Sequence, residues 1–382
     1  MQTRKLFYED SHIKTFSATV LSCEPAENGY LVTLDQTAFY PEGGGQACDL
    51  GTLADANVFD VKEKGEQVLH FCHKALPVGQ KVEGNIQWQR RFDLMQQHTG
   101  EHILSGLIHS RYGYHNSGFH VGENVMEVDF DGAIPEDALW ELEYKANLAV
   151  WQNLPVVCGY PSQEELPGIF YRTKRELPWP VRIVQIGDVD SCACCGVHVK
   201  TTGEVGLIKI LSCVKFHGGV RLEMVCGERA YRYMQDIFLQ NREVSRQISA
   251  KMTETAQGVQ KLTGALNAEK FRACGLEKQV FGAIAASYQG KENVLHIQES
   301  LTGGGVRELA DSIAQKITGI AVVCSGSEEN GYQICIASTV SPVRELGTKA
   351  MQALDGRGGG RDFAFQGTVK ATQAQIQAFF EH

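Results

Sequence analysis

Two histidines stand four positions apart in the sequence HTGEH, at His98 and His102. Apolar residues around them recur at helical spacing, and two residues four apart on a helix lie one above the other on the same face. Both imidazoles can therefore reach one metal ion through their ring nitrogens. Spacing alone favours a buried or capped pair of histidines, so the metal interpretation needs further ligands.

Further candidate ligands occur in the sequence CACCGVH. Cys194 and His198 are also four apart, and Gly196 between them allows a tight turn. Strand-like sequences on both sides predict that this segment is a loop. Thiolate sulfur and imidazole nitrogen are the ligands that zinc takes in tetrahedral sites. The two half-sites together predict a zinc ion held by His98, His102, Cys194 and His198.

Two features of the predicted zinc site stay open. Cys192 and Cys195 lie close enough in sequence to replace Cys194 as the sulfur ligand. Four protein ligands also describe a closed structural site, whereas catalytic zinc keeps one position for water or substrate. Either one histidine is loosely held, or the metal positions substrate instead of activating water.

The sequence HTGEH also matches the H-x-x-E-H pattern of some metalloproteases, in which the glutamate, here Glu101, is the general base. That interpretation leaves Cys194 and His198 without a role. It also needs a downstream carboxylate ligand that the sequence does not single out. We therefore rank the metalloprotease below the zinc site with mixed sulfur and nitrogen ligands.

Composition places the chain among soluble globular proteins. Of its residues, 43% are apolar and 21% are charged, as is usual for globular proteins. A length of 382 residues predicts several domains. No apolar run is long enough to span a membrane, and the N-terminus lacks a signal-peptide pattern, so we expect a cytoplasmic protein. Without an export signal, the 12 cysteines are expected to be reduced. The net charge of −9 argues against a general nucleic-acid coat protein, but not against local basic surfaces.

The pattern along the chain predicts a multidomain α+β protein. Short alternating segments with frequent turns predict an N-terminal β-barrel. An α+β core with the metal ligands follows, then a long amphipathic helical connector and a C-terminal α/β domain. The expected boundaries are 1–89 for the barrel, 90–227 for the core, 228–274 for the connector and 275–382 for the last domain.

Three stretches in sequence order resemble the editing domain of alanyl-tRNA synthetases and its free-standing AlaX-type relatives. They are LDQTAFYPEGGGQACDLGTL, RRFDLMQQHTGEHILSG and CCGVHV. The segment KFHGGVRLEMVCGERA is similar to the end of that domain, and the C-terminal part resembles the C-terminal domain of alanyl-tRNA synthetase. The whole chain thus resembles a long-form AlaX-type trans-editing protein.

The resemblance implies a fold and an activity. The fold is an N-terminal β-barrel, a zinc-containing editing core and a C-terminal domain that aids tRNA binding. The activity is hydrolysis, without ATP, of the ester that joins a wrong amino acid to tRNA for alanine. Serine is the main expected amino acid, with glycine as a further candidate. The implied partners are the mischarged tRNA and a second copy of the chain, bound through the connector or the C-terminal domain.

The resemblance also assigns residues. It matches the four predicted ligands to the zinc site and assigns Thr37 and Gln46 to the catalytic amino-acid pocket. A threonine hydroxyl can bind the serine side chain, which alanine lacks. Without the resemblance, Thr37 is an ordinary strand residue and Gln46 a turn residue.

Two glycine-rich stretches are expected to bind substrate. Gly43, Gly44 and Gly45 either permit a bend or let the terminal adenosine of tRNA approach the backbone. The sequence DGRGGGRDFAFQGT, late in the chain, predicts a glycine-rich loop. It is not a dinucleotide-binding fingerprint, because it does not lie at the turn from a strand into a helix. Its residues Arg357 and Arg361 suit tRNA phosphates, with a plain surface loop as the alternative.

Departures from the family pattern concern the pocket more than the metal. Val197 stands where the family commonly has threonine, Cys195 where it has glycine, and the acidic Glu101 lies between the helix histidines. A second hypothesis of another class is therefore kept: a tRNA-binding module with structural zinc and no activity.

Overall fold

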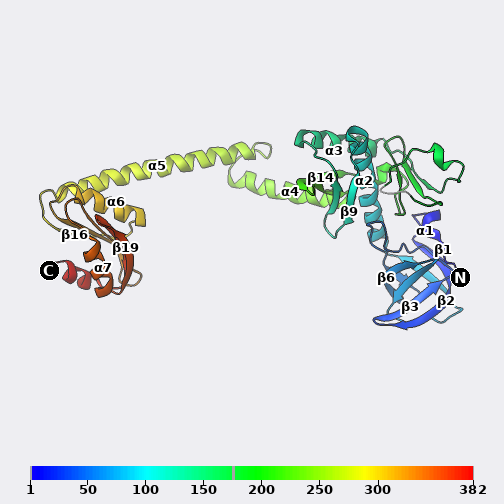
Figure 1. The fold of residues 1–382 in the computed structure, drawn as a ribbon, viewed down its shortest axis with the longest axis horizontal. Coiled ribbons are helices and arrows are strands. Elements are labelled where there is room, and N and C mark those ends of the chain that lie inside the picture. The colour runs from blue at the N-terminus through cyan, green and yellow to red at the C-terminus, as the bar shows by residue number, and fades with distance from the viewer. Residues whose placement is uncertain (1, 174–176, 382) are drawn as a thin grey trace. The chain divides into compact units, whose positions relative to one another are not determined.

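The structure is a computed structural model that describes residues 2–173 and 177–381. The chain divides into two compact units, Met1–Asn241 and Arg242–His382 (Figure 1). Helices and sheets occur in both, which confirms the prediction of a mixed α+β multidomain protein. Among the described residues, no helix is both long and apolar enough to cross a membrane.

The first unit begins with a small barrel. Six strands pair in the closed order β2-β3-β7-β6-β5-β8, with alternate side chains turned inward. The segment between β4 and β5 lies outside the strands and carries the glycines of the sequence EGGGQ. The elements are β1 (Arg4–Lys5), α1 (Leu6–Glu9), β2 (Thr15–Ala26), β3 (Gly29–Leu34), β4 (Gln36–Thr37), β5 (Gly51–Leu53), β6 (Ala56–Lys64), β7 (Gln67–Cys72) and β8 (Lys81–Ile86).

A long buried helix, α2 (Trp88–Tyr112), follows the barrel and carries the histidine pair. Most of its side chains are buried, as expected of a helix packed on several sides. It ends at Gly113, which adopts a left-handed conformation with φ of 73° and donates its N–H to the His109 carbonyl. One hydrophobic cluster runs from the barrel through α2 into the following sheets.

The rest of this unit packs two sheets against α2. A four-stranded sheet has the order β14-β15-β10-β9, and a three-stranded sheet has the order β11-β12-β13. The elements are β9 (Asn116–Val121), β10 (Met126–Phe130), α3 (Glu136–Trp151), β11 (Val156–Gly159), η1 (Leu166–Gly168), β12 (Ile183–Ile186), β13 (Asp190–Ala193), η2 (Thr202–Val205), β14 (Ile208–Phe216), β15 (Gly219–Cys226) and α4 (Gly227–Gln247).

Two buried contacts fix α2 in this unit. The Arg91 guanidinium is fully buried and donates to the Asp49 carboxylate and the Ala38 carbonyl, which ties the helix to the segment after β4. On the other side, a Cβ at Gly100 would lie 2.3 Å from Cys226 Sγ, so only glycine allows this approach of α2 to β15. The position of the histidines is thus set from both sides.

The second unit is a five-stranded sheet covered on both faces. Its order is β16-β17-β18-β20-β19. Alternate residues of β17 belong to different cores, one with α5 and α6 and one with α7 and α8. The elements are α5 (Thr255–Ser287), β16 (Val294–Ile297), α6 (Gly303–Ala314), β17 (Ile320–Ser327), β18 (Gly331–Ser338), α7 (Arg344–Ala353), β19 (Gly356–Arg361), β20 (Ala364–Val369) and α8 (Gln373–Phe380).

Two local predictions are corrected by the structure. The sequence GRGGGR is not a loop but the edge strand β19, which pairs with β20 along its whole length. Glycine suits this strand because a Cβ at Gly360 would lie 2.2 Å from the Ala364 carbonyl oxygen. The helical connector is interrupted at residues 248–254, and α5 continues to Ser287, beyond the predicted end of the connector at residue 274.

Candidate metal centre

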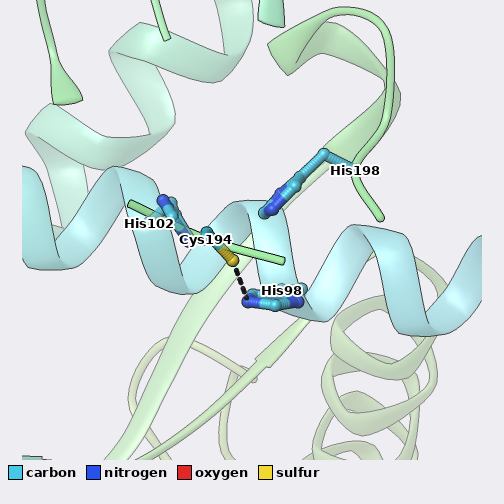
Figure 2. A group of neighbouring side chains, drawn as sticks. All are labelled: His98, His102, Cys194 and His198. Carbon is cyan, nitrogen blue, oxygen red and sulfur yellow. Dashed lines mark hydrogen bonds between the residues drawn. The ribbon is translucent and has the colours of Figure 1, made fainter. Parts of the chain in front are cut away.

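Four side chains from two distant segments converge beside α2. His98 and His102 project from the helix, and Cys194 and His198 come from the segment after β13 (Figure 2). The possible ligand atoms of all four lie within 4.8 Å of one another. Cys194 Sγ is 3.4 Å from His98 Nε2. The structure therefore brings together the four residues that the sequence analysis selected.

The segment with Cys194 approaches the helix closely because it contains Gly196. A Cβ at this position would lie 2.1 Å from His98 Cε1. The buried Arg182 holds the segment by donating from Nη1 to the carbonyl oxygens of Cys194 and Gly196, each at 2.8 Å. The Gly196 N–H also points to Cys194 Sγ at 3.3 Å, a contact that favours the thiolate.

Each histidine of the cluster is oriented through its Nδ1 atom. When Nδ1–H donates to an oxygen, Nε2 keeps its lone pair for a metal, an arrangement common around protein-bound zinc. The partners and distances are Gln46 Oε1 at 2.8 Å for His98, Asp190 Oδ2 at 2.9 Å for His102 and Thr99 Oγ1 at 3.1 Å for His198.

His198 supplies the clearest sign that the cluster is made for a ligand. Its Nε2 is buried and has no hydrogen-bond partner among the described residues. A buried polar atom without a partner costs free energy, and a metal ion would satisfy it. Three imidazole nitrogens and one thiolate fit a metal ion and are compatible with zinc.

The three candidate cysteines differ in their position relative to the cluster. Cys194 belongs to the cluster of four, whereas Cys195 is exposed and its carbonyl accepts a hydrogen bond from Tyr8 at 2.9 Å. Cys192 lies on β13 in a second group, with His102 and Asp190. Geometry thus favours Cys194 as the sulfur of the four-ligand group.

Electrostatics inside the cluster favour a thiolate. Burial raises the pKa of the Cys194 thiol, but His98 and His102 outweigh it, and the pKa lies well below its usual range. Burial lowers the pKa of His198 to about 3, so this imidazole is neutral at physiological pH. Burial also lowers the pKa of His102, but Cys194 and Asp190 raise it well above its usual value.

The glycine turn before β5 positions one of these histidines. Gly43 and Gln46 form a tight turn with N–H to carbonyl distances of 3.1 and 3.0 Å, and Gly44 and Gly45 have φ of 60° and 82°. The turn aims Gln46 Oε1 at His98 Nδ1. The structure therefore gives Gln46 a contact with a ligand histidine, while its Nε2 has no partner among the described residues.

Thr37 lies elsewhere, inside the barrel. It is fully buried, and its hydroxyl contacts His70 Nε2 at 2.8 Å and accepts the Phe39 N–H at 3.1 Å. It is not among the residues that line the cavity beside the cluster. The structure thus brings Gln46 to the metal site but not Thr37, whose contact with serine stays a prediction.

A cavity of about 460 Å³ opens beside the four ligands. Its wall includes Gly44 and Gly45 of the glycine turn, and Phe119, against which Gly45 packs so closely that a Cβ would lie 2.5 Å from the ring. The wall also contains Glu101, Asn116 and Arg172. A volume of this size is in the usual range for small-molecule sites, about 300–1,000 Å³.

Several residues of this site were missed by the sequence analysis. Asn116 and Arg172 line the cavity, and Thr99 and Asp190 orient ligand histidines. Arg172 also forms an ion pair with Asp190, with Nε to Oδ1 at 2.7 Å. Thr99 lies inside the HTGEH sequence, and Asp190 lies two residues before Cys192. Their closeness in sequence to the ligands was the one signal available.

The remaining predicted substrate contacts lie in the second unit. Arg357 and Arg361 are at opposite ends of β19, and both side chains are exposed. Both therefore lie on one edge strand, and their contact with tRNA stays a prediction.

Two family models of known proteins match parts of this chain. A family model described as the threonyl and alanyl tRNA synthetase second additional domain matches residues 181–223, the region of Cys194 and His198. A second model, class II (A) tRNA synthetases, matches residues 3–90. Both models describe parts of tRNA synthetases, and the first of them spans Cys194 and His198.

Individual relatives match nearly the whole chain. Alanyl-tRNA editing protein Aarsd1 of Danio rerio is 27% identical over 97% of this chain and 96% of that protein. Alanyl-tRNA editing protein AlaX-L of Pyrococcus horikoshii is 27% identical over 97% and 96%. Alanine–tRNA ligase of Pyrobaculum aerophilum is 32% identical over 97% of this chain but 43% of the ligase. These matches confirm the predicted resemblance: the chain is a homologue of long-form AlaX-type editing proteins.

The matching solved structures include a domain of a tRNA synthetase. The C-Ala domain of Aquifex aeolicus alanyl-tRNA synthetase is 21% identical and covers 24% of this chain and 92% of that domain, with a TM-score of 0.22. This similarity is too low to support a conclusion.

Proposed function

We propose that this protein hydrolyses the ester bond of mischarged tRNA for alanine, acting on seryl-tRNA and as a second substrate glycyl-tRNA, with zinc at the four-residue cluster. The observation that carries the proposal is the cluster itself: four ligand atoms within 4.8 Å, one of them the unpartnered His198 Nε2, beside a cavity. Full-length relatives named as alanyl-tRNA editing proteins support the choice of substrate.

His98, His102, Cys194 and His198 would hold the metal ion. Bound zinc supplies a positive charge that can orient an ester or stabilise negative charge on its oxygen. An aminoacyl ester is already activated, so placing it beside a water molecule is most of the catalytic task. With four protein ligands, we favour a metal that positions the substrate.

The protein residues around the cluster would bind the aminoacyl end of tRNA. A Cβ at Gly44 would meet no atom within 4 Å, so the glycine turn presents open backbone to the cavity. This backbone is a suitable contact for the terminal adenosine. Gln46 would act through His98, which it holds in place, and Thr37 would act indirectly, by fixing the chain that leads to the turn.

The direct test is deacylation of seryl-, glycyl- and alanyl-tRNA for alanine by the purified protein, with zinc measured in the same sample. We expect hydrolysis of the first two, sparing of alanyl-tRNA, and about one zinc per chain, as a single site requires. Zinc at that level with no deacylation of any substrate would instead favour a tRNA-binding module with structural zinc.

A Glu101→Gln variant separates the metalloprotease from the editing enzyme. In that alternative, Glu101 is the general base, so Glu101→Gln would abolish peptide hydrolysis. An editing enzyme with the same substitution should keep at least part of its deacylase activity. Cleavage of an unstructured protein substrate by the wild type would support the protease.

We propose that the second unit binds tRNA through Arg357 and Arg361. Both are exposed on an edge strand, and arginine suits phosphate contacts. The double substitution to alanine should weaken binding of full-length tRNA without changing hydrolysis of a short aminoacyl-adenosine ester. Equal tRNA affinity in wild type and variant would contradict this role.

We also propose that two copies of the chain associate through the helical segments. Apolar side chains are exposed along α4 and α5, including Ile237, Phe238, Leu262 and Leu266. Such surfaces commonly mark protein interfaces. Light scattering after gel filtration should give a dimer mass for the full chain, and a monomer mass at all concentrations would contradict the proposal.

A further inference from the structure

Asn116 has a buried acceptor that the proposed chemistry leaves unused. The residue lines the cavity beside the metal cluster and is 8% exposed. Its Oδ1 has no hydrogen-bond partner among the described residues. An acceptor left in this state is costly, and a bound molecule that brings a donor would remove the cost.

The orientation of the amide is fixed by Glu101. Asn116 Nδ2 donates to Glu101 Oε1 at 2.5 Å, and Ser105 Oγ donates to the same oxygen. A carboxylate oxygen only accepts hydrogen bonds, so the amide nitrogen must face it and Oδ1 must face away. Glu101 itself is 4% exposed, which keeps this contact out of water.

The backbone also turns this side chain toward the cavity. Asn116 is the first residue of β9, and the pairing with β10 shifts there: Asp129 pairs with Gly118, but Phe130 pairs with Asn116. Ser117 is therefore an extra residue in the strand. Bulges of this kind redirect a neighbouring side chain and are frequent beside active sites.

We propose that Asn116 Oδ1 accepts a hydrogen bond from the side-chain hydroxyl of the aminoacyl substrate and so selects serine over alanine. This inference rests on the proposed function. A neutral amide oxygen matches a neutral hydroxyl, whereas the positive amine of the amino acid is attracted more strongly to the Glu101 carboxylate in the same wall. An alanine methyl brings no donor and would leave Oδ1 unpaired.

This arrangement gives Glu101 a role that needs no protease chemistry. It acts as a positioning residue, because it holds the amide of Asn116 in the orientation that presents oxygen to the substrate. The departure from the family pattern at Glu101 then concerns amino-acid selection and not the metal.

The test measures binding and hydrolysis separately. Calorimetry of the zinc-loaded protein compares the seryl and alanyl amides of 3′-amino-3′-deoxyadenosine, which cannot be hydrolysed as esters are. We expect the wild type to bind the seryl compound at least about tenfold more tightly, since a site built for a hydroxyl discriminates strongly against its absence. Equal binding of the two compounds by wild type would overturn the inference, and this result needs no variant.

Asn116→Leu keeps the approximate size and removes the acceptor. It should bring the two affinities within about twofold of each other, and it should lower kcat/KM on seryl-tRNA at least about tenfold while changing glycyl-tRNA little. Ser117→Ala is the matched control, since Ser117 is exposed and does not line the cavity. Equal losses on both tRNAs would overturn the inference. Wild type that prefers the seryl amide but hydrolyses no tRNA would refute the proposed function alone.

Discussion

The first unit buries histidines in two places, the barrel and the metal cluster. In the barrel, His70 uses both ring nitrogens: Nε2 contacts Thr37 Oγ1 at 2.8 Å and Nδ1 contacts the Val32 carbonyl at 3.2 Å. In the cluster, His198 Nδ1 contacts Thr99, but Nε2 has no partner among the described residues. Burial alone therefore does not mark a ligand. The unpartnered Nε2 distinguishes His198, a candidate metal ligand, from His70, whose ring nitrogens both have partners.

The largest expected effect comes from removing a ligand of the cluster. Cys194→Ser should reduce bound zinc to near zero and lower deacylation of seryl-tRNA at least about 100-fold, because the thiolate is the strongest ligand of the group. Zinc content and deacylation rate are measured on the same sample. Cys195→Ser is the control, since Cys195 is exposed. Equal zinc loss in both variants would contradict the assignment of the sulfur ligand.

The next effect tests a residue that acts through a ligand. Gln46→Leu removes the acceptor of His98 Nδ1, and loss of such contacts typically lowers metal affinity about 10–100-fold. Competition with a zinc-binding dye measures the affinity. An unchanged affinity combined with lost deacylation would show that Gln46 meets the substrate directly.

Protonation of the barrel histidine, His70, should change the stability of the fold and not the zinc content. Burial lowers the pKa of His70 to about 4, below the value near 6.5 expected in the unfolded chain. The unfolded state then binds the proton first as pH falls, so stability is lost from about pH 6.5 down to about pH 4, by about 2 kcal/mol at pH 5.

Urea unfolding of the wild type and His70→Gln between pH 7.5 and 4.5 measures this effect. The variant should be less stable at pH 7.5 and should lose less stability on acidification. Its zinc content at neutral pH should equal that of the wild type. Parallel pH profiles for the two proteins would argue against a neutral buried His70.

The smallest effect is expected from Thr37→Val. The substitution keeps the shape but removes the contacts with His70 and the Phe39 N–H, which should cost about 1–2 kcal/mol of stability. Because Thr37 does not line the cavity, the ratio of seryl- to glycyl-tRNA hydrolysis should change less than about twofold. A selective loss on seryl-tRNA would restore the role in serine binding that the sequence predicted.

Much of this site was predictable because its ligands are histidine and cysteine, two uncommon residue types that bind metals, spaced as a helix or a turn requires. The pair His98 and His102 and the pair Cys194 and His198 were found without coordinates. Helix α2 begins at Trp88, close to the predicted boundary between the barrel and the core. The partners of the ligands were not found. Asn116 is an ordinary residue type at a strand start, and its importance comes from a bulge and a contact with Glu101 that depend on tertiary packing.

The errors in the fold have a similar cause. The sequence GRGGGR has low intrinsic strand preference, so local reasoning predicts a loop. In the structure it pairs with β20, and its glycines let the two backbones approach closely. Pairing between strands overrides local preference here, and a single sequence does not show it.

The measurement that tests the central claim most directly is X-ray absorption at the zinc edge of the loaded wild-type protein and of Cys194→Ser. The proposed site predicts one sulfur at about 2.3 Å and nitrogen ligands at about 2.0–2.1 Å in the wild type. The sulfur signal should disappear in the variant. A sulfur signal that persists in Cys194→Ser, or two sulfurs in the wild type, would contradict the account by placing another cysteine on the metal.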